Sequence, residues 1–264
     1  MRRLFILISP LLSLYLPAHV FAGEELNSIT ENAVTGKMYE RAVQFFTEKI
    51  PEAFEKQLSE SQKYIDVTTR IFSDKDIPLD LAYLPLIESG FSPLSVGRGD
   101  AVGLWQLVKG TAKRYGLRID HYVDERKDPV KSTYAAANYL RDLYQMFGGW
   151  DIALAAYNAG DGKIKHLLGK YKNVRFPGMV NLYLAKFMAA ATVAQDPESY
   201  GLTPPEEKTD DGPGYSEIIT DKSISLRAIA GTCNTTVRAI KELNPALITN
   251  ATPPYRYVIR LPNP

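Results

Sequence analysis

The sequence predicts a mainly α-helical domain followed by a small α+β module, and two observations support this fold class. Apolar residues recur at helical spacing through most of residues 37–194. Residues 201–214 then hold prolines, glycines and charges but almost no apolar side chain, which is typical of a linker. Beyond that linker the pattern becomes strand, helix, helix and strand. A chain of 264 residues with 45% hydrophobic content is long enough to bury one substantial core and a small second one.

The first half of the helical region divides at its prolines. Residues 37–72 predict two helices, the second restarted by Pro51. Residues 79–87 predict another helix that tolerates Pro85 with a local kink and stops around Ser89-Gly90.

The second half carries clearer helix signals. Asp128-Pro129 is typical of an N-cap followed by proline at the first helical position, and Gly148-Gly149 is expected to end that long helix. Residues 150–158 predict a short helix closed by Gly160, and residues 179–194 predict a further helix with an alanine-rich face.

The N-terminus predicts export. Residues 1–22 combine Arg2 and Arg3, an apolar run and a small-residue cleavage site, as in a secretory signal peptide. The alternative, a membrane anchor, is disfavoured because the apolar run is shorter than the roughly 20 residues that span a bilayer. Position 23 is Gly rather than Cys, so no lipid anchor is signalled. We expect the mature chain in the periplasm or cell envelope.

Charge and metal-ligating residues exclude several classes of function. Without Arg2 and Arg3, 29 Lys and Arg stand against 30 Asp and Glu, a net charge of −1 that does not suggest a nucleic-acid binder. The single cysteine, Cys233, cannot form an internal disulfide. His121 and His166 stand alone, without ligand-like spacing, so we expect neither a metal site nor a cofactor.

One carboxylate stands out. Glu88 follows Leu84, Leu86 and Ile87, and burial against such groups would raise its pKa. At pH 7 a glutamate of ordinary pKa, about 4.3, is protonated in about one molecule in 500. Raised to near 6, the pKa would leave about one in ten protonated, enough to serve as a general acid. The alternative is a solvated glutamate at a helix end.

A glycine-rich loop follows Glu88. Gly97, Gly99 and Gly103 allow the chain to double back toward that carboxylate, and Gln106 then offers an amide to a sugar oxygen or acetamido group. Each feature alone is common, because Gly-x-Gly is a weak motif and Trp105 is more often a core residue. The specific signal is their ordered combination.

That combination resembles a known family. "ESGFSP…GDAVGLWQL…GTA", residues 88–112, and "ALAAYNAGDG", residues 153–162, resemble the soluble lytic transglycosylase domain of glycoside hydrolase family 23. The stretch "VDERKDPVKSTYAAANYLRDLY" and the later "YLAKFMAAATVAQDPESYG" look like the membrane-bound lytic transglycosylase D branch of that family. The two main motifs agree in spacing across roughly 110 residues.

The resemblance implies a lysozyme-like helical fold around a peptidoglycan cleft. It assigns Glu88 as the sole catalytic acid and base, and Gln106 and Tyr157 as contacts of the N-acetyl sugar. Ala156 and Asn158 would flank that contact, while Trp105 would support the loop. Tyr157 also admits a purely structural role in the core.

The implied reaction cleaves the bond between N-acetylmuramic acid and N-acetylglucosamine without water. Glu88 protonates the bridging oxygen, then takes a proton from the C6 hydroxyl of the same sugar, which attacks C1 and leaves a 1,6-anhydro ring. An intramolecular nucleophile is worth roughly 7 kcal/mol or more, so no second carboxylate is needed to activate water.

Two alternatives remain open. Goose-type lysozymes, which hydrolyse the same bond, carry aspartates at the positions of Gly97 and Val108, where neither residue is acidic here, although Asp100 is nearby. Family members usually carry Ser at Gly97 and Glu-Thr at Met179-Val180, so the chain lacks a hydroxyl and a carboxylate expected near the sugar. This leaves an inactive, peptidoglycan-binding protein as the third hypothesis.

The tail resembles a divergent LysM domain. The helical part spans Ser225–Leu247, with an expected core of Leu226, Ile229, Ala230, Val237, Ile240 and Leu243, and the final strand lies within Tyr255–Pro262. Such a module would bind glycan chains or serve in packing. The predicted organisation is a signal peptide (1–22), a transglycosylase domain (23–200), a linker (201–214) and a LysM-like module (215–264), with peptidoglycan glycan strands as partner.

Overall fold

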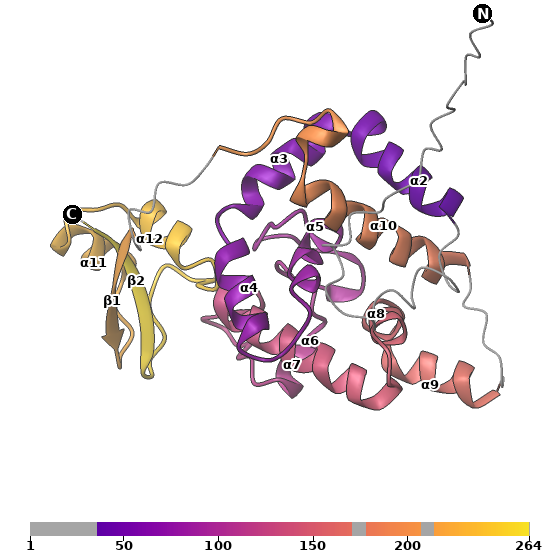
Figure 1. Cartoon of the computed structure of the whole chain (residues 1–264). Coiled ribbons are helices and arrows are strands. Elements are labelled where there is room, and N and C mark those ends of the chain that lie inside the picture. Colours follow the sequence, from indigo (N-terminus) through magenta and orange to yellow (C-terminus); the bar gives the residue numbers. More distant parts are fainter. Residues whose placement is uncertain (1–35, 171–177, 207–213, 264) are drawn as a thin grey trace, which may run out of the picture.

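The computed structural model describes residues 36–170, 178–206 and 214–263. It contains a helical domain and a small C-terminal module that stands at one side of it (Figure 1). The helices of the domain are α2 (Gly36–Gln44), α3 (Pro51–Ser61), α4 (Ile65–Ser73), α5 (Pro85–Glu88), α6 (Lys109–Arg114), α7 (Pro129–Phe147), α8 (Trp150–Ala159), α9 (Asp161–Lys170) and α10 (Gly178–Gln195), with a π-helix η1 (Phe45–Lys49) and the 3-10 helices η2 (Leu79–Tyr83), η3 (Arg98–Asp100), η4 (Glu125–Lys127) and η5 (Glu198–Tyr200). The predicted mainly helical domain with a small α+β module is thereby confirmed.

The first helical region corrects the prediction of two helices over residues 37–72. Pro51 does begin a helix, but α3 ends at Ser61 and α4 begins at Ile65. Between them Tyr64 leaves the helical backbone conformation, with φ of −132°, and its N–H donates to Ser61 O at 2.9 Å. No glycine or proline lies at this break, so the apolar spacing in the sequence predicted one continuous helix where the structure has two.

The long helix α7 forms where its local signals predict it. The Asp128 carboxylate accepts hydrogen bonds from the backbone N–H groups of Val130 and Lys131, at 3.0 and 2.9 Å, and so caps the helix. At the other end Gly148 takes the left-handed conformation that favours glycine, with φ of 76°. Helix α8 follows immediately and packs against α7.

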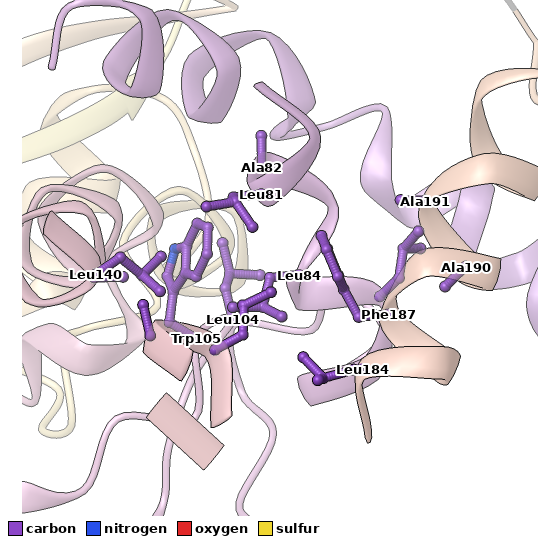
Figure 2. Close-up of a cluster of buried hydrophobic side chains, with 14 of the residues drawn as sticks. Leu81, Ala82, Leu84, Leu104, Trp105, Leu140, Leu184, Phe187, Ala190 and Ala191 are labelled. Carbon is purple, nitrogen blue, oxygen red and sulfur yellow. The ribbon is translucent and has the colours of Figure 1, made fainter. Parts of the chain in front are cut away.

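Helix α10 is the central element of the domain, in contact with α2, α5, α8 and η2. Ala185, Ala189, Ala190 and Ala191 of this helix are fully buried, as expected for the face that holds Ala185 and Ala189. Small side chains let the neighbouring elements approach closely. Figure 2 shows Leu184 and Phe187 of α10 on one side of Leu84, and Leu104, Trp105 and Leu140 on the other.

The C-terminal module has the predicted strand, helix, helix and strand. Strands β1 (Tyr215–Thr220) and β2 (Tyr257–Pro262) pair antiparallel in a two-stranded sheet, with Ile218 opposite Ile259. Helices α11 (Leu226–Thr232) and α12 (Val237–Leu243) lie between them in sequence. A separate buried cluster forms around this sheet from Val123, Leu226, Ile229, Ala230, Ile240, Leu247, Tyr257, Ile259 and Leu261.

The described residues bear on two further predictions. Residues 1–22, the predicted signal peptide, lie outside the described part of the chain, as do residues 207–213 of the predicted linker. Leu202 at the start of that linker is buried in the core of the helical domain, and the Thr203 N–H donates to Glu55 Oε1 at 2.7 Å. The helical domain therefore extends at least to residue 203.

Candidate active site

Glu88 ends a helix of only four residues. Pro85 begins α5, and buried Leu84 and Leu86 anchor this turn in the core. The chain then reverses, because Gly90 and Phe91 both have positive φ, 62° and 57°. A Cβ on Gly90 would lie 2.8 Å from Gln57 Cγ, so glycine serves here both for its backbone and for its size. The Glu88 side chain is half-buried at this turn.

The Glu88 carboxyl group is held by Tyr183 of α10. The Tyr183 hydroxyl donates a hydrogen bond to Glu88 Oε1 at 2.6 Å. Burial raises the pKa of the Glu88 carboxyl, while this hydrogen bond acts in the opposite direction and lowers it. Burial also raises the pKa of the Tyr183 hydroxyl well above its ordinary value, and the charge on Glu88 raises it further. Tyr183 therefore stays protonated and remains a donor.

Tyr157 connects helix α8 to the glycine-rich loop. Its hydroxyl donates to the Trp105 carbonyl oxygen at 2.6 Å, and its ring packs against Tyr139 with 5.3 Å between the ring centroids. Burial raises the pKa of the Tyr157 hydroxyl, and the charge on Glu88 is the next cause. Tyr157 thus lies within electrostatic reach of Glu88, and its hydroxyl positions the loop.

Trp105 is a structural residue, as the sequence indicated. Its ring is fully buried and stacks on Phe72, with 5.3 Å between ring centroids. The indole Nε1 donates to Thr133 Oγ1 of α7 at 2.9 Å. Trp105 therefore fixes the loop in the core and leaves its carbonyl group for Tyr157.

Gln106 takes part in the loop's own structure. Its backbone has a positive φ of 48°, and its side-chain Nε2 donates to the Gly103 carbonyl oxygen at 2.8 Å and to that of Ser95 at 3.4 Å. A Cβ on Gly97 would lie 2.2 Å from Gln106 Oε1. The absence of a side chain at position 97 therefore leaves the space that the Gln106 side-chain amide occupies.

The two residues beside Tyr157 differ in exposure. Ala156 is fully buried in the core, and its carbonyl oxygen accepts the Gly160 N–H at 2.8 Å. Asn158 is exposed. Of the pair, only Asn158 presents a side chain that a ligand can reach from solvent.

Tyr183 was not among the residues predicted to form the site. The family's expected carboxylate and hydroxyl fall at Met179 and Val180 in the same helix, yet the group that contacts Glu88 comes from Tyr183, four residues beyond Met179. The side chain of Met179 lies outside what the structure describes. The signal that could have found Tyr183 is its place at the start of "YLAKFMAAATVAQDPESYG", a stretch that resembles the transglycosylase D branch.

The described residues hold no group of three or more His, Cys, Asp or Glu that could bind a metal ion. Nor is any described helix long and apolar enough to cross a membrane. The chemistry that the site offers is proton transfer: a desolvated carboxyl group is hydrogen-bonded to one phenol, Tyr183, and its charge acts on a second, Tyr157, which binds the glycine-rich loop.

Comparisons with known proteins agree on one domain. Residues 74–176 match the family model described as "Transglycosylase SLT domain". The chain is 27% identical over 217 residues to "Membrane-bound lytic murein transglycosylase D" of Escherichia coli (strain K12). This alignment covers 75% of the present chain and 48% of the relative. It is 33% identical over 112 residues to "Soluble lytic murein transglycosylase" of the same strain, covering 40% of this chain and 17% of that one.

A solved structure, the 70 kDa soluble lytic transglycosylase from Escherichia coli, aligns with a TM-score of 0.38 and 27% identity, covering 52% of this chain and 24% of that one. The present chain spans about half the length of the transglycosylase D that it matches.

Proposed function

We propose that the chain is a peptidoglycan lytic transglycosylase, because residues 74–176 match the transglycosylase SLT domain model. In this proposal it cleaves the β-1,4 bond between N-acetylmuramic acid and N-acetylglucosamine and leaves a 1,6-anhydro end on the muramic acid. The observation that carries the proposal is the Glu88 carboxyl group, desolvated and hydrogen-bonded to Tyr183.

The first step needs Glu88 protonated. Burial supplies this state by raising the carboxyl pKa. The bond from Tyr183 engages Oε1, so Oε2 carries the proton toward the glycosidic oxygen. As the proton is transferred, the C1–O bond breaks and its electron pair stays with the leaving N-acetylglucosamine oxygen. The substrate's acetamido group stabilises the positive charge that develops at C1.

The second step uses the same residue as a base. Glu88, now a carboxylate, accepts the proton of the C6 hydroxyl, and O6 forms the new bond to C1. The Tyr183 hydrogen bond favours the charged carboxylate, so it stabilises this intermediate form. Burial favours one protonation state and Tyr183 the other, which lets a single group donate and then accept a proton.

The alternative, hydrolysis, requires a second carboxylate that activates water. Asp100, the acidic residue in the glycine-rich loop, has a largely exposed carboxylate that lies 3.4 Å from Arg126 Nη1. Positions 97 and 108 are Gly and Val. This arrangement favours attack by the sugar's own hydroxyl.

Two finer points belong to the same proposal. We place the enzyme in the periplasm or cell envelope after removal of residues 1–22, and peptidoglycan strands are its partner. Determination of the N-terminal residue of the exported protein tests this, with Gly23 expected. The LysM-like identity of residues 215–264 also stays a proposal.

Product analysis tests the proposed reaction. Purified sacculi digested with the wild-type chain should release 1,6-anhydromuropeptides, each one water lighter than the hydrolytic product by mass spectrometry. Glu88→Gln should release none, while Asp80→Asn, which removes another buried carboxylate, should remain active. Reducing-end muramic acid would instead establish hydrolysis, and sedimentation with sacculi without products would establish a binding protein.

A further inference from the structure

The segment Arg118–Asp128, between α6 and α7, joins the C-terminal module to the helical domain. Backbone hydrogen bonds run both ways: the Asp124 N–H donates to Ala246 O, and the Ile248 N–H donates to Tyr122 O, both at 2.9 Å. Between them, Val123 is fully buried and belongs to the hydrophobic cluster of the module. The module is therefore built around a residue of the helical domain, and Figure 1 shows its loops reaching toward that domain.

Side chains reinforce this junction on both sides. Arg260 of β2 lies 3.2 Å from Asp128 Oδ2, and both side chains are largely buried. The Tyr255 hydroxyl donates to Asp120 Oδ2 at 2.6 Å, and the Arg118 guanidinium lies 4.0 Å from the centre of the Tyr255 ring. Buried ion pairs and aromatic stacking of this kind hold two surfaces in one geometry.

The same segment binds the glycine-rich loop through the side chain of Arg126. The side chain is 4% exposed, and its Nε and Nη2 bind the two oxygens of the Asp124 carboxylate at 2.9 and 2.7 Å. Its Nη1 donates to the backbone carbonyls of Asp100, at 2.6 Å, and Leu107, at 3.2 Å. A single guanidinium thus connects the residue that the module binds to both ends of the loop.

The loop between those two carbonyls carries active-site residues. Gly103 packs so closely under the segment that a Cβ would lie 1.9 Å from the Arg126 carbonyl oxygen. Two residues on, the Trp105 carbonyl accepts the Tyr157 hydroxyl, and Gln106 follows. A shift of Arg126 would therefore move the loop that Tyr157 binds, and the charge of Glu88 acts on Tyr157.

We propose that Arg126 is a positioning residue for the reaction, and that the C-terminal module, docked on Tyr122–Asp124, sets the glycine-rich loop through it. The inference rests on the proposed function for its kinetic consequence. The module then acts on turnover through the loop, in addition to any contact that it makes with glycan.

Kinetics on a soluble, uncrosslinked glycan oligomer test the inference. Arg126→Lys keeps the positive charge but offers one nitrogen, which cannot replace the five hydrogen bonds that the guanidinium makes to carbonyl and carboxylate oxygens. It should lower kcat about tenfold or more with KM within about twofold, since small misplacement of reacting groups costs turnover. Arg260→Gln in the module should lower kcat about threefold. The matched control is Arg238→Gln, whose side chain lies exposed on the same module and pairs only with Glu242 among the described residues.

Hydrogen exchange supplies a readout that is independent of activity. The Gly97 N–H donates to Ala101 O at 2.8 Å and the Gly103 N–H to Ser95 O at 2.9 Å. Both amides should exchange faster in Arg126→Lys and Arg260→Gln, while the amides of β1 and β2 stay protected. If the wild type makes no anhydro product but the Gly97 and Gly103 amides exchange faster in the two variants, the proposed function is wrong. The coupling between the C-terminal module and the glycine-rich loop is then still supported. Loop exchange and kcat at wild-type values in both variants, or a rise in KM alone, would overturn the inference.

Discussion

Two carboxylates eight residues apart, Asp80 and Glu88, are both held against helix α10, yet by different partners. Asp80 Oδ1 accepts a hydrogen bond from the Gln195 amide at 2.8 Å, and Glu88 Oε1 accepts one from the Tyr183 hydroxyl at 2.6 Å. Burial is the largest cause of the raised pKa in both, and for Asp80 it brings the value to about 6. A perturbed pKa is therefore common to the two groups.

Their surroundings differ. Asp80 lies in η2 with 8% of its surface exposed and no glycine-rich loop after it, whereas Glu88 ends α5 where the chain turns into such a loop. Of the two acids, Glu88 is the one whose charge acts on Tyr157, which binds the loop that Trp105 anchors. Burial and a raised pKa are shared by both acids, so the neighbouring Tyr157 and glycine-rich loop are what make Glu88 the candidate catalyst.

The largest expected effect separates the two acids by activity. Glu88→Gln should lower the rate of anhydromuropeptide release at least about a thousandfold, since the substitution removes the general acid and base together. Asp80→Asn should stay within about threefold of the wild type. Initial rates on purified sacculi measure both, and a comparable loss in the two variants would end the distinction.

The partner of the acid gives the next effect. Tyr183→Phe removes the hydrogen bond that lowers the Glu88 pKa, so that pKa should rise further. Because the reaction begins from protonated Glu88, activity falls as pH rises through its pKa, and this alkaline limb should move to higher pH. The rate at the optimum should fall about tenfold, as the carboxylate form loses its donor. Tyr157→Phe is the control: its hydroxyl bonds Trp105, and the limb should not move.

The raised pKa of Asp80 should make the free energy of unfolding depend on pH. Its folded pKa of about 6 lies above the unfolded value of about 3.8, so its contribution to stability is fully present below pH 3.8 and is lost as pH rises through 6. Asp80→Asn is neutral throughout and should exceed the wild type by about 2 kcal/mol at pH 7, with no gain at pH 3.5. Urea unfolding at the two pH values measures this, and equal gains at both would contradict it.

The smallest effect concerns the loop, where acid strength plays no part. Gly97→Ala would push a Cβ against Gln106 Oε1 and displace that amide. KM should rise about threefold, while kcat and the alkaline limb of the pH profile stay unchanged. A shifted limb would mean that the loop also controls the Glu88 pKa.

Elements with local signals could be predicted from the sequence. The N-cap of helix α7, Asp128, and the glycine that ends it, Gly148, are directly adjacent to the helix in sequence. The helix begins and ends at these residues in the structure. The roles of Glu88 and Trp105 could also be predicted from the sequence, because an acid after an apolar run and an aromatic residue in a glycine-rich loop are local patterns. The break at Tyr64 and helix α9 lacked such signals and were missed.

Contacts between distant residues could not be predicted. Tyr183 is 95 residues from Glu88, and Arg126 reaches 26 residues back to Asp100. Their roles depend on how α10 and the Arg118–Asp128 segment pack, which no short pattern encodes. Gln106 was expected to contact a sugar, and no sequence pattern predicts that its amide also donates to the carbonyl oxygen of Gly103 in the loop. Its sugar contact stays a prediction.

Burial in the folded chain should keep the Glu88 carboxyl neutral to higher pH than an exposed glutamate. A ¹³C NMR titration of the glutamate side-chain carboxyl carbons, with Glu88→Gln to assign the signal, measures this directly. A midpoint clearly above 4.5, moving further up in Tyr183→Phe, is the predicted result. A midpoint at or below 4.5 in the wild type would contradict the account.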